Sequence, residues 1–128
     1  VDIYSRKYWT SPRFDWIEPI DPVLAERLFD WGVTSGPSTP VKYLQRILNV
    51  LNRQGKDFAD ISADGLVGNE TIYALRTLIK KRGQDGLKVT RFMLQSQQSN
   101  FYFTLAEKNP MQEEFEFGWQ LNRAMGVE

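Results

Sequence analysis

Apolar side chains recur every three or four residues along much of the chain, which is the spacing of one face of an α-helix. Asp21-Pro22 predicts a helix start, because aspartate caps a first turn and proline fits inside it. Gly36-Pro37 predicts the end of that helix, and two further helices should end at Gly55 and Gly83. We expect one core to hold the three apolar faces, formed by Leu24, Leu28 and Trp31; Leu44, Leu48 and Leu51; and Ile72, Leu75 and Ile79.

The rest of the chain follows the same helical pattern. A long helix is predicted from about residue 85 to 108, and a last helix should follow Asn109-Pro110 and end near Gly126. Residues 2–8 would be the last turns of an earlier helix, and residues 13–20 would form a loop. Apolar and polar residues alternate over no sustained stretch, so we expect no sheet. The sequence therefore predicts an all-α, single-domain protein with five to six helices.

Aromatic residues are expected in its core near the end of the chain. The two clusters are Phe101-Tyr102-Phe103 and the segment from Phe115 to Trp119, each placed on a predicted helix. Large aromatic side chains bury the most apolar surface, so core packing is the favoured interpretation for both clusters. Phe14 and Trp16 should likewise attach the predicted loop of residues 13–20 to the core.

Charge and composition narrow the classes of partner. Hydrophobic residues make up 41% of the 128 positions, which suits one packed domain. Sixteen basic residues balance sixteen acidic ones without a basic stripe, so nucleic acid is not an expected partner. The apolar runs span only a few residues, so no membrane span is expected either.

The absence of cysteine and histidine restricts the chemistry further. Without these residues the chain has no disulfides, no thiolate nucleophile and no histidine base, and it lacks the usual zinc ligands. We expect no metal and no cofactor. Acid–base chemistry would have to rest on Asp or Glu, which is how glycosidases work.

Two motifs contain closely spaced glycines. Gly32 and Gly36 stand four residues apart on one helical face, which would let a ligand or another backbone approach; tight helix packing is the alternative. Nearby, Asp30 should orient the backbone or a neighbouring helix. The segment from Asp64 to Thr71 predicts a turn with two glycines able to take positive φ, followed by Asn69 as the cap of the next helix.

Taken in order, the segments 28–37, 41–46 and 64–71 resemble the back portion of the glycoside hydrolase 108 family, whose members cleave bacterial peptidoglycan as N-acetylmuramidases. Asn109-Pro110 and Gly118-Trp119 resemble the closing pattern of that family. The corresponding segment there is described as a predicted peptidoglycan-binding domain. The resemblance implies a lysozyme-like helical domain over residues 1–128.

The same resemblance assigns parts of the chain to different roles. Residues 1–20 would be the end of an upstream catalytic segment and a loop, and residues 21–126 the peptidoglycan-binding region. The catalytic glutamate of the family belongs to a Glu-Gly-Gly motif, which this sequence lacks. No catalytic residue is therefore assigned. We expect a fragment of a muramidase without turnover, from which design or proteolysis removed the catalytic segment.

The resemblance also implies a sugar-binding groove. Tyr8 and Trp9 would lie where the chain enters the cleft, Thr34 and Gly36 at the helix end that borders it, and Gln45 would offer its amide to sugar hydroxyls. These five residues should converge on one groove. The alternative is that Trp9 is buried and that Gln45 caps a loop.

Two other functions remain open at this point. The chain would be a binding module that recognises the cell wall without cutting it, or a helical adaptor that acts in secretion through a protein partner, since relatives are labelled secretion activators. The expected ligand is peptidoglycan or its fragments. The expected location is the periplasm or the exterior, or the cytoplasm for a phage endolysin.

Overall fold

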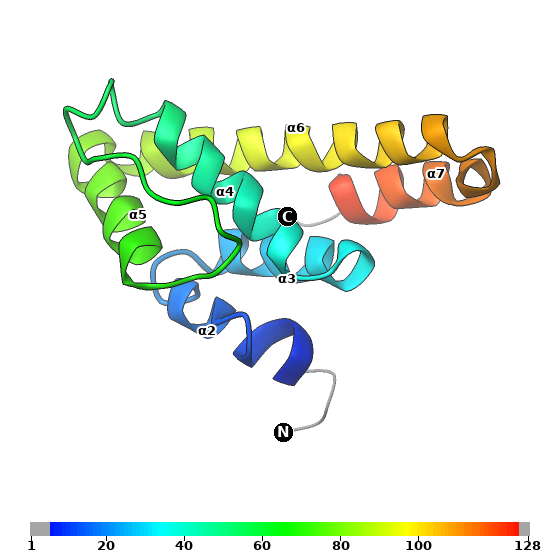
Figure 1. Cartoon of the computed structure of the whole chain (residues 1–128), viewed down its shortest axis with the longest axis horizontal. Helices are drawn as coiled ribbons and strands as arrows, with labels where there is room; N and C mark the ends of the chain where they lie inside the picture. Colours follow the sequence, from blue (N-terminus) through cyan, green and yellow to red (C-terminus); the bar gives the residue numbers. More distant parts are fainter. Residues whose placement is uncertain (1–5, 126–128) are drawn as a thin grey trace.

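The computed structural model describes residues 6–125, and these residues form helices and loops without a strand (Figure 1). In chain order the elements are the π-helix η1 (Arg6–Thr10), α2 (Phe14–Ile17), α3 (Pro22–Ser35), α4 (Ser38–Val50), α5 (Asn69–Arg82), α6 (Gln84–Lys108), the 3-10 helix η2 (Pro110–Gln112), α7 (Glu113–Trp119) and the π-helix η3 (Gln120–Ala124). The prediction of an all-α protein is confirmed. None of the helices within this part of the chain is both long and apolar enough to cross a membrane.

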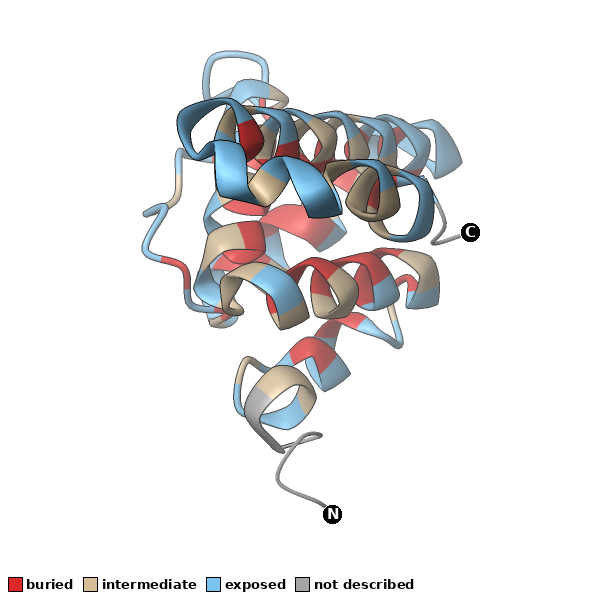
Figure 2. Cartoon of the chain, turned by 90° about the vertical axis from the view of Figure 1, so that its right-hand side faces the viewer, coloured by how far each residue is buried: buried red, intermediate tan, exposed pale blue. Residues whose placement is uncertain are grey.

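The core lies where α3, α4 and α5 pack together and against the first half of α6 (Figures 1 and 2). The predicted apolar faces meet there, as expected. Six of their nine residues are fully buried, namely Leu24, Leu28, Trp31, Leu44, Leu48 and Leu75, and the other three pack against them while partly exposed. Burial of these side chains is the main favourable term in the stability of the fold.

The helix ends around α3 explain the first glycine motif. Asp21 caps α3 with its carboxylate, which accepts a hydrogen bond from the Val23 amide at 3.3 Å. A Cβ on Gly32 would lie 3.2 Å from Cα of Pro37, so glycine lets the chain fold back closely into α4. Gly36 has φ of 88°, a conformation that favours glycine. Close packing, the alternative left open by the sequence, accounts for Gly32.

The structure corrects two predicted segments near the start of the chain. Residues 13–20 are not wholly a loop, because α2 occupies four of them and buries Phe14 and Ile17 completely. A helix was expected over residues 2–8, and the structure has helix η1 over residues 6–10, whereas residues 2–5 lie outside the described residues. The predicted end of the last helix, near Gly126, also lies outside them. The aromatic segment is therefore attached to the core by a short helix.

The second half of α6 continues beyond the bundle and, together with η2, α7 and η3, forms an arm (Figure 1). The prediction that both late aromatic clusters pack in the core is wrong for three residues: Phe103, Phe115 and Phe117 are 55%, 52% and 77% exposed. For Phe115 and Phe117 the reason is that α7 packs on α6 and on its own neighbours in sequence, which leaves its outer side in solvent (Figure 2). Phe103 lies on α6 and is likewise exposed. Tyr102 is buried, and Trp119 stacks on it at 5.3 Å.

The core assignment is tested by replacing Leu48 with alanine. Because Leu48 is fully buried, the truncation should lower the free energy of unfolding by about 2–5 kcal/mol, measured by urea denaturation. The matched control is Val50→Ala on the same helix, where the side chain is 70% exposed and the effect should be small. Equal effects of the two changes would contradict this assignment of the core.

Candidate functional site

A cleft of about 460 Å³ lies between the residues that precede α2 and the loop that leads into α5. Its walls carry backbone amides, hydroxyls and charged groups. The lining residues are Ser11, Pro12, Arg13, Gln45, Ser62 and the whole segment from Asp64 to Thr71. The second glycine motif thus forms one complete wall of the cleft.

Three amide side chains, two on α4 and one just past its end, hold the loop that builds this wall. Gln45 and Asn49 are four residues apart and therefore point to the same side of α4, and Asn52 lies two residues beyond the last residue of the helix, Val50. Asn49 binds both backbone groups of Ile61, with its Nδ2 2.9 Å from the carbonyl and its Oδ1 2.8 Å from the amide. Oδ1 of Asn52 accepts from the Gly55 amide at 2.9 Å. We call these three side chains the amide ladder.

Of these three side chains, Gln45 is the one that lines the cleft, and only 1% of its surface is exposed. Its Oε1 accepts a hydrogen bond from the Gly65 amide at 2.9 Å. Its Nε2 lies 2.9 Å from the Leu66 carbonyl, 3.0 Å from Oγ1 of Thr71 and 3.1 Å from Oδ1 of Asp64. The carboxamide therefore joins both ends of the motif, which is the loop-capping arrangement that the sequence left open.

Asp64 holds the turn from its other side. Its Oδ1 accepts from the Leu66 amide at 3.0 Å as well as from Gln45, and these hydrogen bonds lower the pKa of the Asp64 carboxyl from its usual 3.8. The carboxylate is consequently charged at neutral pH and lies at the edge of the cleft. Among residues 6–125, no three acidic side chains come together as a candidate metal site.

The two glycines of the motif have different roles. Gly65 has φ of 81°, and a Cβ there would lie 3.0 Å from Cβ of Ser38, so both its backbone and its surroundings require glycine. Gly68 is extended, with φ of −126°, which corrects the expectation that both glycines use positive φ. A Cβ on Gly68 would meet nothing within 4 Å, so the backbone is open there.

Gly68, rather than the predicted Asn69, is the N-cap of α5, and no side chain caps the first turn. The first N–H groups of a helix have no partner within the helix, and they carry a partial positive charge. Gly68, Asn69 and Glu70 all line the cleft. This wall therefore offers backbone donors to an acceptor on a ligand.

Arg13 forms the opposite wall, and the sequence analysis missed it. Its backbone is left-handed, with φ of 65°, which is uncommon for a residue other than glycine. Its Nη1 donates to the Val67 carbonyl at 3.3 Å, across the cleft. Its guanidinium also lies 4.4 Å from the ring centre of Trp16, which is 39% exposed rather than packed in the core as expected. The density of aromatic residues was the sole sequence signal for this segment.

Residues 39–124 match the family described as "Predicted Peptidoglycan domain", which is more than half of the chain. The chain belongs to this peptidoglycan domain family. The match runs from α4 to the end of η3, so it includes the amide ladder and the glycine motif but not the wall formed by Arg13. No curated protein matches the sequence.

In this peptidoglycan domain the other predicted binding residues lie away from the cleft lined by Gln45. Trp9 is partly buried and packs edge-on against Phe14, at 6.2 Å, and Phe29, at 5.6 Å. Tyr8 is partly buried beside it. The structure thus does not bring Trp9 and Gln45 into one pocket, and a sugar contact at Tyr8 or Trp9 stays a prediction.

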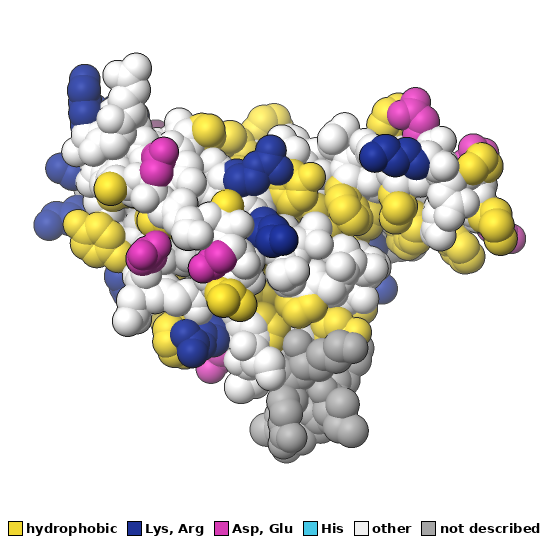
Figure 3. Space-filling view, viewed as in Figure 1, with side chains coloured by type: hydrophobic (Ala, Val, Ile, Leu, Met, Phe, Trp, Pro, Cys, Tyr) yellow, Lys and Arg dark blue, Asp and Glu magenta, His cyan; other side chains and the backbone are white. Residues whose placement is uncertain are grey.

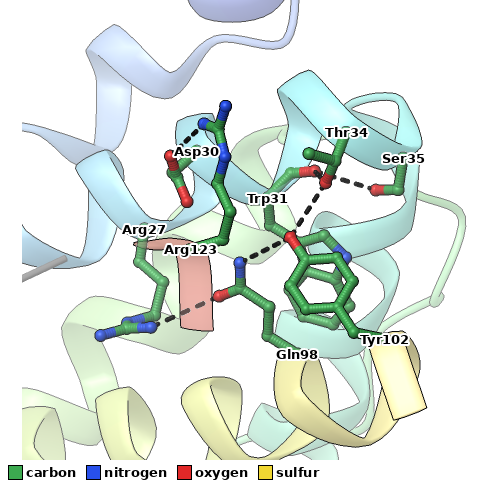
Figure 4. A network of polar contacts seen from close by, with 8 residues as sticks. All are labelled: Arg27, Asp30, Trp31, Thr34, Ser35, Gln98, Tyr102 and Arg123. Carbon is green, nitrogen blue, oxygen red and sulfur yellow. Dashed lines mark hydrogen bonds and ion pairs between the residues drawn. The ribbon is translucent and has the colours of Figure 1, made fainter. Parts of the chain in front are cut away.

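Thr34 and Gly36 lie at the end of α3, where Thr34 joins a chain of polar contacts with α6 (Figure 4). Oγ1 of Thr34 donates to the Trp31 carbonyl and lies 2.9 Å from the Tyr102 hydroxyl, so Tyr102 is the donor of that pair. Burial raises the pKa of Tyr102, which keeps the hydroxyl protonated. The Thr34 hydroxyl is therefore engaged within the domain, and a sugar contact at Thr34 or Gly36 also stays a prediction.

The same chain of contacts continues to the end of the peptidoglycan domain. Nε2 of Gln98 donates to the Tyr102 hydroxyl at 3.0 Å, and the buried Arg27 donates to Oε1 of Gln98 at 3.3 Å and to the Ala124 carbonyl at 2.8 Å. Asp30 pairs with Arg123 at 2.6 Å. Asp30 thus holds η3 against α3, which is the orienting role expected for it. We call this set of contacts the polar joint; it consists of Arg27, Asp30, Thr34, Gln98, Tyr102 and Arg123.

The pKa of Asp64 leads to a prediction for Asp64→Asn. Because the pKa in the folded state is lowered, the charged form contributes stability above pH 3.8, and this contribution is lost as the pH falls through the lowered value. The variant should therefore unfold at a lower temperature than the original protein at pH 7, while the two should coincide well below pH 3.8. Thermal unfolding across the pH range measures both.

The exposed Glu18 provides the control for this experiment. Glu18 is the residue that follows α2 and lies outside the lining of the cleft. Glu18→Gln should unfold at almost the same temperature as the original protein at both pH 7 and low pH. If Asp64→Asn still unfolds at a lower temperature than the original protein at low pH, the charge of Asp64 is not what stabilises the turn.

Proposed function

We propose that this chain is the wall-binding part of an N-acetylmuramidase-type glycoside hydrolase, and that it holds peptidoglycan in the cleft between Arg13 and the segment from Asp64 to Thr71. The observation that carries the proposal is the position of the glycine motif. The motif lies within the residues that match the peptidoglycan domain family, and it forms one wall of a polar cleft.

The groups in the cleft suit the chemistry of peptidoglycan. That polymer presents sugar hydroxyls and acetamido groups, together with carboxylates and amines on its peptide stems. The guanidinium of Arg13 and the uncapped N–H groups of α5 can donate to carboxylates and carbonyls. The carboxylates of Asp64 and Glu70 can accept from amines and hydroxyls.

Trp16 extends this surface beside the cleft. Its indole is partly exposed, and the guanidinium of Arg13 covers one face of the ring. Aromatic rings of this kind combine an apolar face with a polar edge, which suits contact with the apolar face of a sugar. Arg13 and Trp16 together would therefore bind sugar and peptide groups next to each other.

Binding is tested by sedimenting the protein with insoluble peptidoglycan. Loss of a charge-assisted hydrogen bond of about 1.5–3 kcal/mol predicts that Arg13→Ala binds at least tenfold more weakly. Arg76→Ala is the control, because Arg76 is exposed on α5 and does not line the cleft. Circular dichroism verifies that both variants fold. Equal binding of the two variants would overturn the proposed site.

A titration with a soluble disaccharide-peptide locates the site on the domain. Amide shifts concentrated at Gly68 and Asn69 would support the cleft described here. Shifts centred on Trp9 and Thr34 would favour the groove expected from the resemblance to glycoside hydrolase 108.

We expect the chain as given to bind peptidoglycan without cutting it. A glycosidase needs a general acid whose pKa is raised. The pKa of Asp64, a carboxyl that lines the cleft, is instead lowered by its hydrogen bonds from the Leu66 amide and from Gln45, so Asp64 is ionised at neutral pH. Incubation with labelled cell wall should release no more soluble label than buffer does. Strong release would show that one of the carboxyls of this chain is the acid, and would contradict the proposal that the chain binds without cutting.

A further inference from the structure

One face of α6 carries a row of six residues whose types are symmetric about its centre. Read from either end, a charged residue is followed by a phenylalanine and a serine, and the two charged ends have opposite signs. At spacings of four or three residues, the row consists of Lys88, Phe92, Ser96, Ser99, Phe103 and Glu107. Such spacings place all six on one side of a helix. Phe92 and Phe103 are 67% and 55% exposed, which is unusual for phenylalanine in a packed domain. We call this set the α6 stripe.

We propose that two copies of this chain associate through the α6 stripe, with their α6 helices antiparallel. A two-fold axis midway between Ser96 and Ser99 places Phe92 of each copy opposite Phe103 of the other. The same axis places Lys88 of each copy opposite Glu107 of the other, so two lysine–glutamate ion pairs form across the interface. A parallel arrangement in register would instead oppose Lys88 to Lys88, and repulsion would disfavour it.

The centre of the stripe is shaped for such close contact. Ser96 is small and exposed, and helices with small residues at their contact approach to about 8 Å between axes. Ser99 is also small but only partly exposed, because its hydroxyl donates to Oε1 of Gln120 on η3 at 2.8 Å. Beside them, a hollow of about 430 Å³ lies between α6 and η3 and is lined in part by Phe92, Ser96, Ser99 and Met125. In the antiparallel pair, Phe103 of the second copy enters this hollow.

The neighbouring surface extends the apolar contact. Phe117 and Leu121 on α7 and η3 are exposed, and so is Met125 at the rim of the hollow. Figure 3 shows hydrophobic side chains gathered along the arm formed by α6 and α7. Exposed large apolar side chains on neighbouring elements of this kind are typical of an interface.

The charges at the two ends of α6 are complementary. Glu107, Glu113 and Glu114 are exposed at the tip of the arm beside Lys108, so acidic residues outnumber basic ones there. Basic residues outnumber acidic ones at the other end of α6, where Lys80–Arg82 and Lys88 lie near Asp85. Antiparallel pairing brings each acidic tip towards the basic end of the other copy. This complementarity favours a second copy as the occupant.

Exchange of the terminal charges tests both the pairing and its direction. Sedimentation equilibrium should show a dimer of the original chain at about 100 µM, a concentration well above the dissociation constant of a standard-size interface. Lys88→Glu alone and Glu107→Lys alone should each weaken the dimer at least tenfold, since each opposes like charges, which costs several kcal/mol. An equimolar mixture of the two variants should form a heterodimer in native mass spectrometry, because all its opposed pairs are again of opposite sign.

Two further variants distinguish this interface from non-specific association. Phe103→Glu should abolish the dimer, whereas Tyr73→Glu, at an exposed aromatic residue on α5, should leave it intact. A monomer at every concentration would overturn the proposal, as would a dimer that is indifferent to Phe103→Glu. Single charge variants that weaken the dimer without pairing in the mixture would overturn the antiparallel register. None of these results depends on whether the cleft binds peptidoglycan.

Discussion

The arrangement of the cleft depends on the hydrogen bonds that the amide ladder makes with the chain between α4 and α5. This connection contains no helix or strand of its own, so its backbone polar groups have few partners within it. Gln45 and Asn49 supply those partners from α4 and Asn52 supplies them from just beyond its end, and each has both a donor and an acceptor in use. Together with the burial of Val67 in the core, these hydrogen bonds fix the segment from Asp64 to Thr71 opposite Arg13.

The polar joint has a corresponding role on the other side of the bundle. Its buried members lie between α3, α6 and η3, and the hydrogen-bonding groups of Gln98 and Tyr102 are engaged with one another. A buried network of this kind stabilises one relative position of the helices, because any displacement leaves polar groups without partners. The end of α3, which the sequence suggested as a sugar-binding site, is in the structure mainly a helix junction.

The helices could be predicted from the sequence because their apolar faces and most of their end signals agree, although α4 ends at Val50 and not at the predicted Gly55. Asp21-Pro22 and the apolar face of α4 are local patterns, and the structure confirms both. The exposure of Phe115 and Phe117 could not be predicted, because burial depends on whether another element covers α7, and the apolar pattern of a helix is the same in either case. Part of the cleft could be predicted from the sequence, since Gly65 and Asp64 belong to a recognisable turn. Arg13 was not, because it reaches Val67 from 54 positions away in the chain.

The choice of amides for the ladder affects how the domain behaves in different surroundings. Carboxamides and backbone groups do not titrate, and bonds between neutral groups are hardly screened by counterions. Cell-wall polymers are charged, and the ion concentration and acidity near them differ from those of the bulk solution. The neutral hydrogen bonds of the ladder keep their geometry under such conditions, whereas its hydrogen bonds to the carboxylates of Asp60 and Asp64 respond to acidity, as do the exposed charges at the rim of the cleft. The shape of the cleft and the charge at its rim are thereby largely under separate physical control.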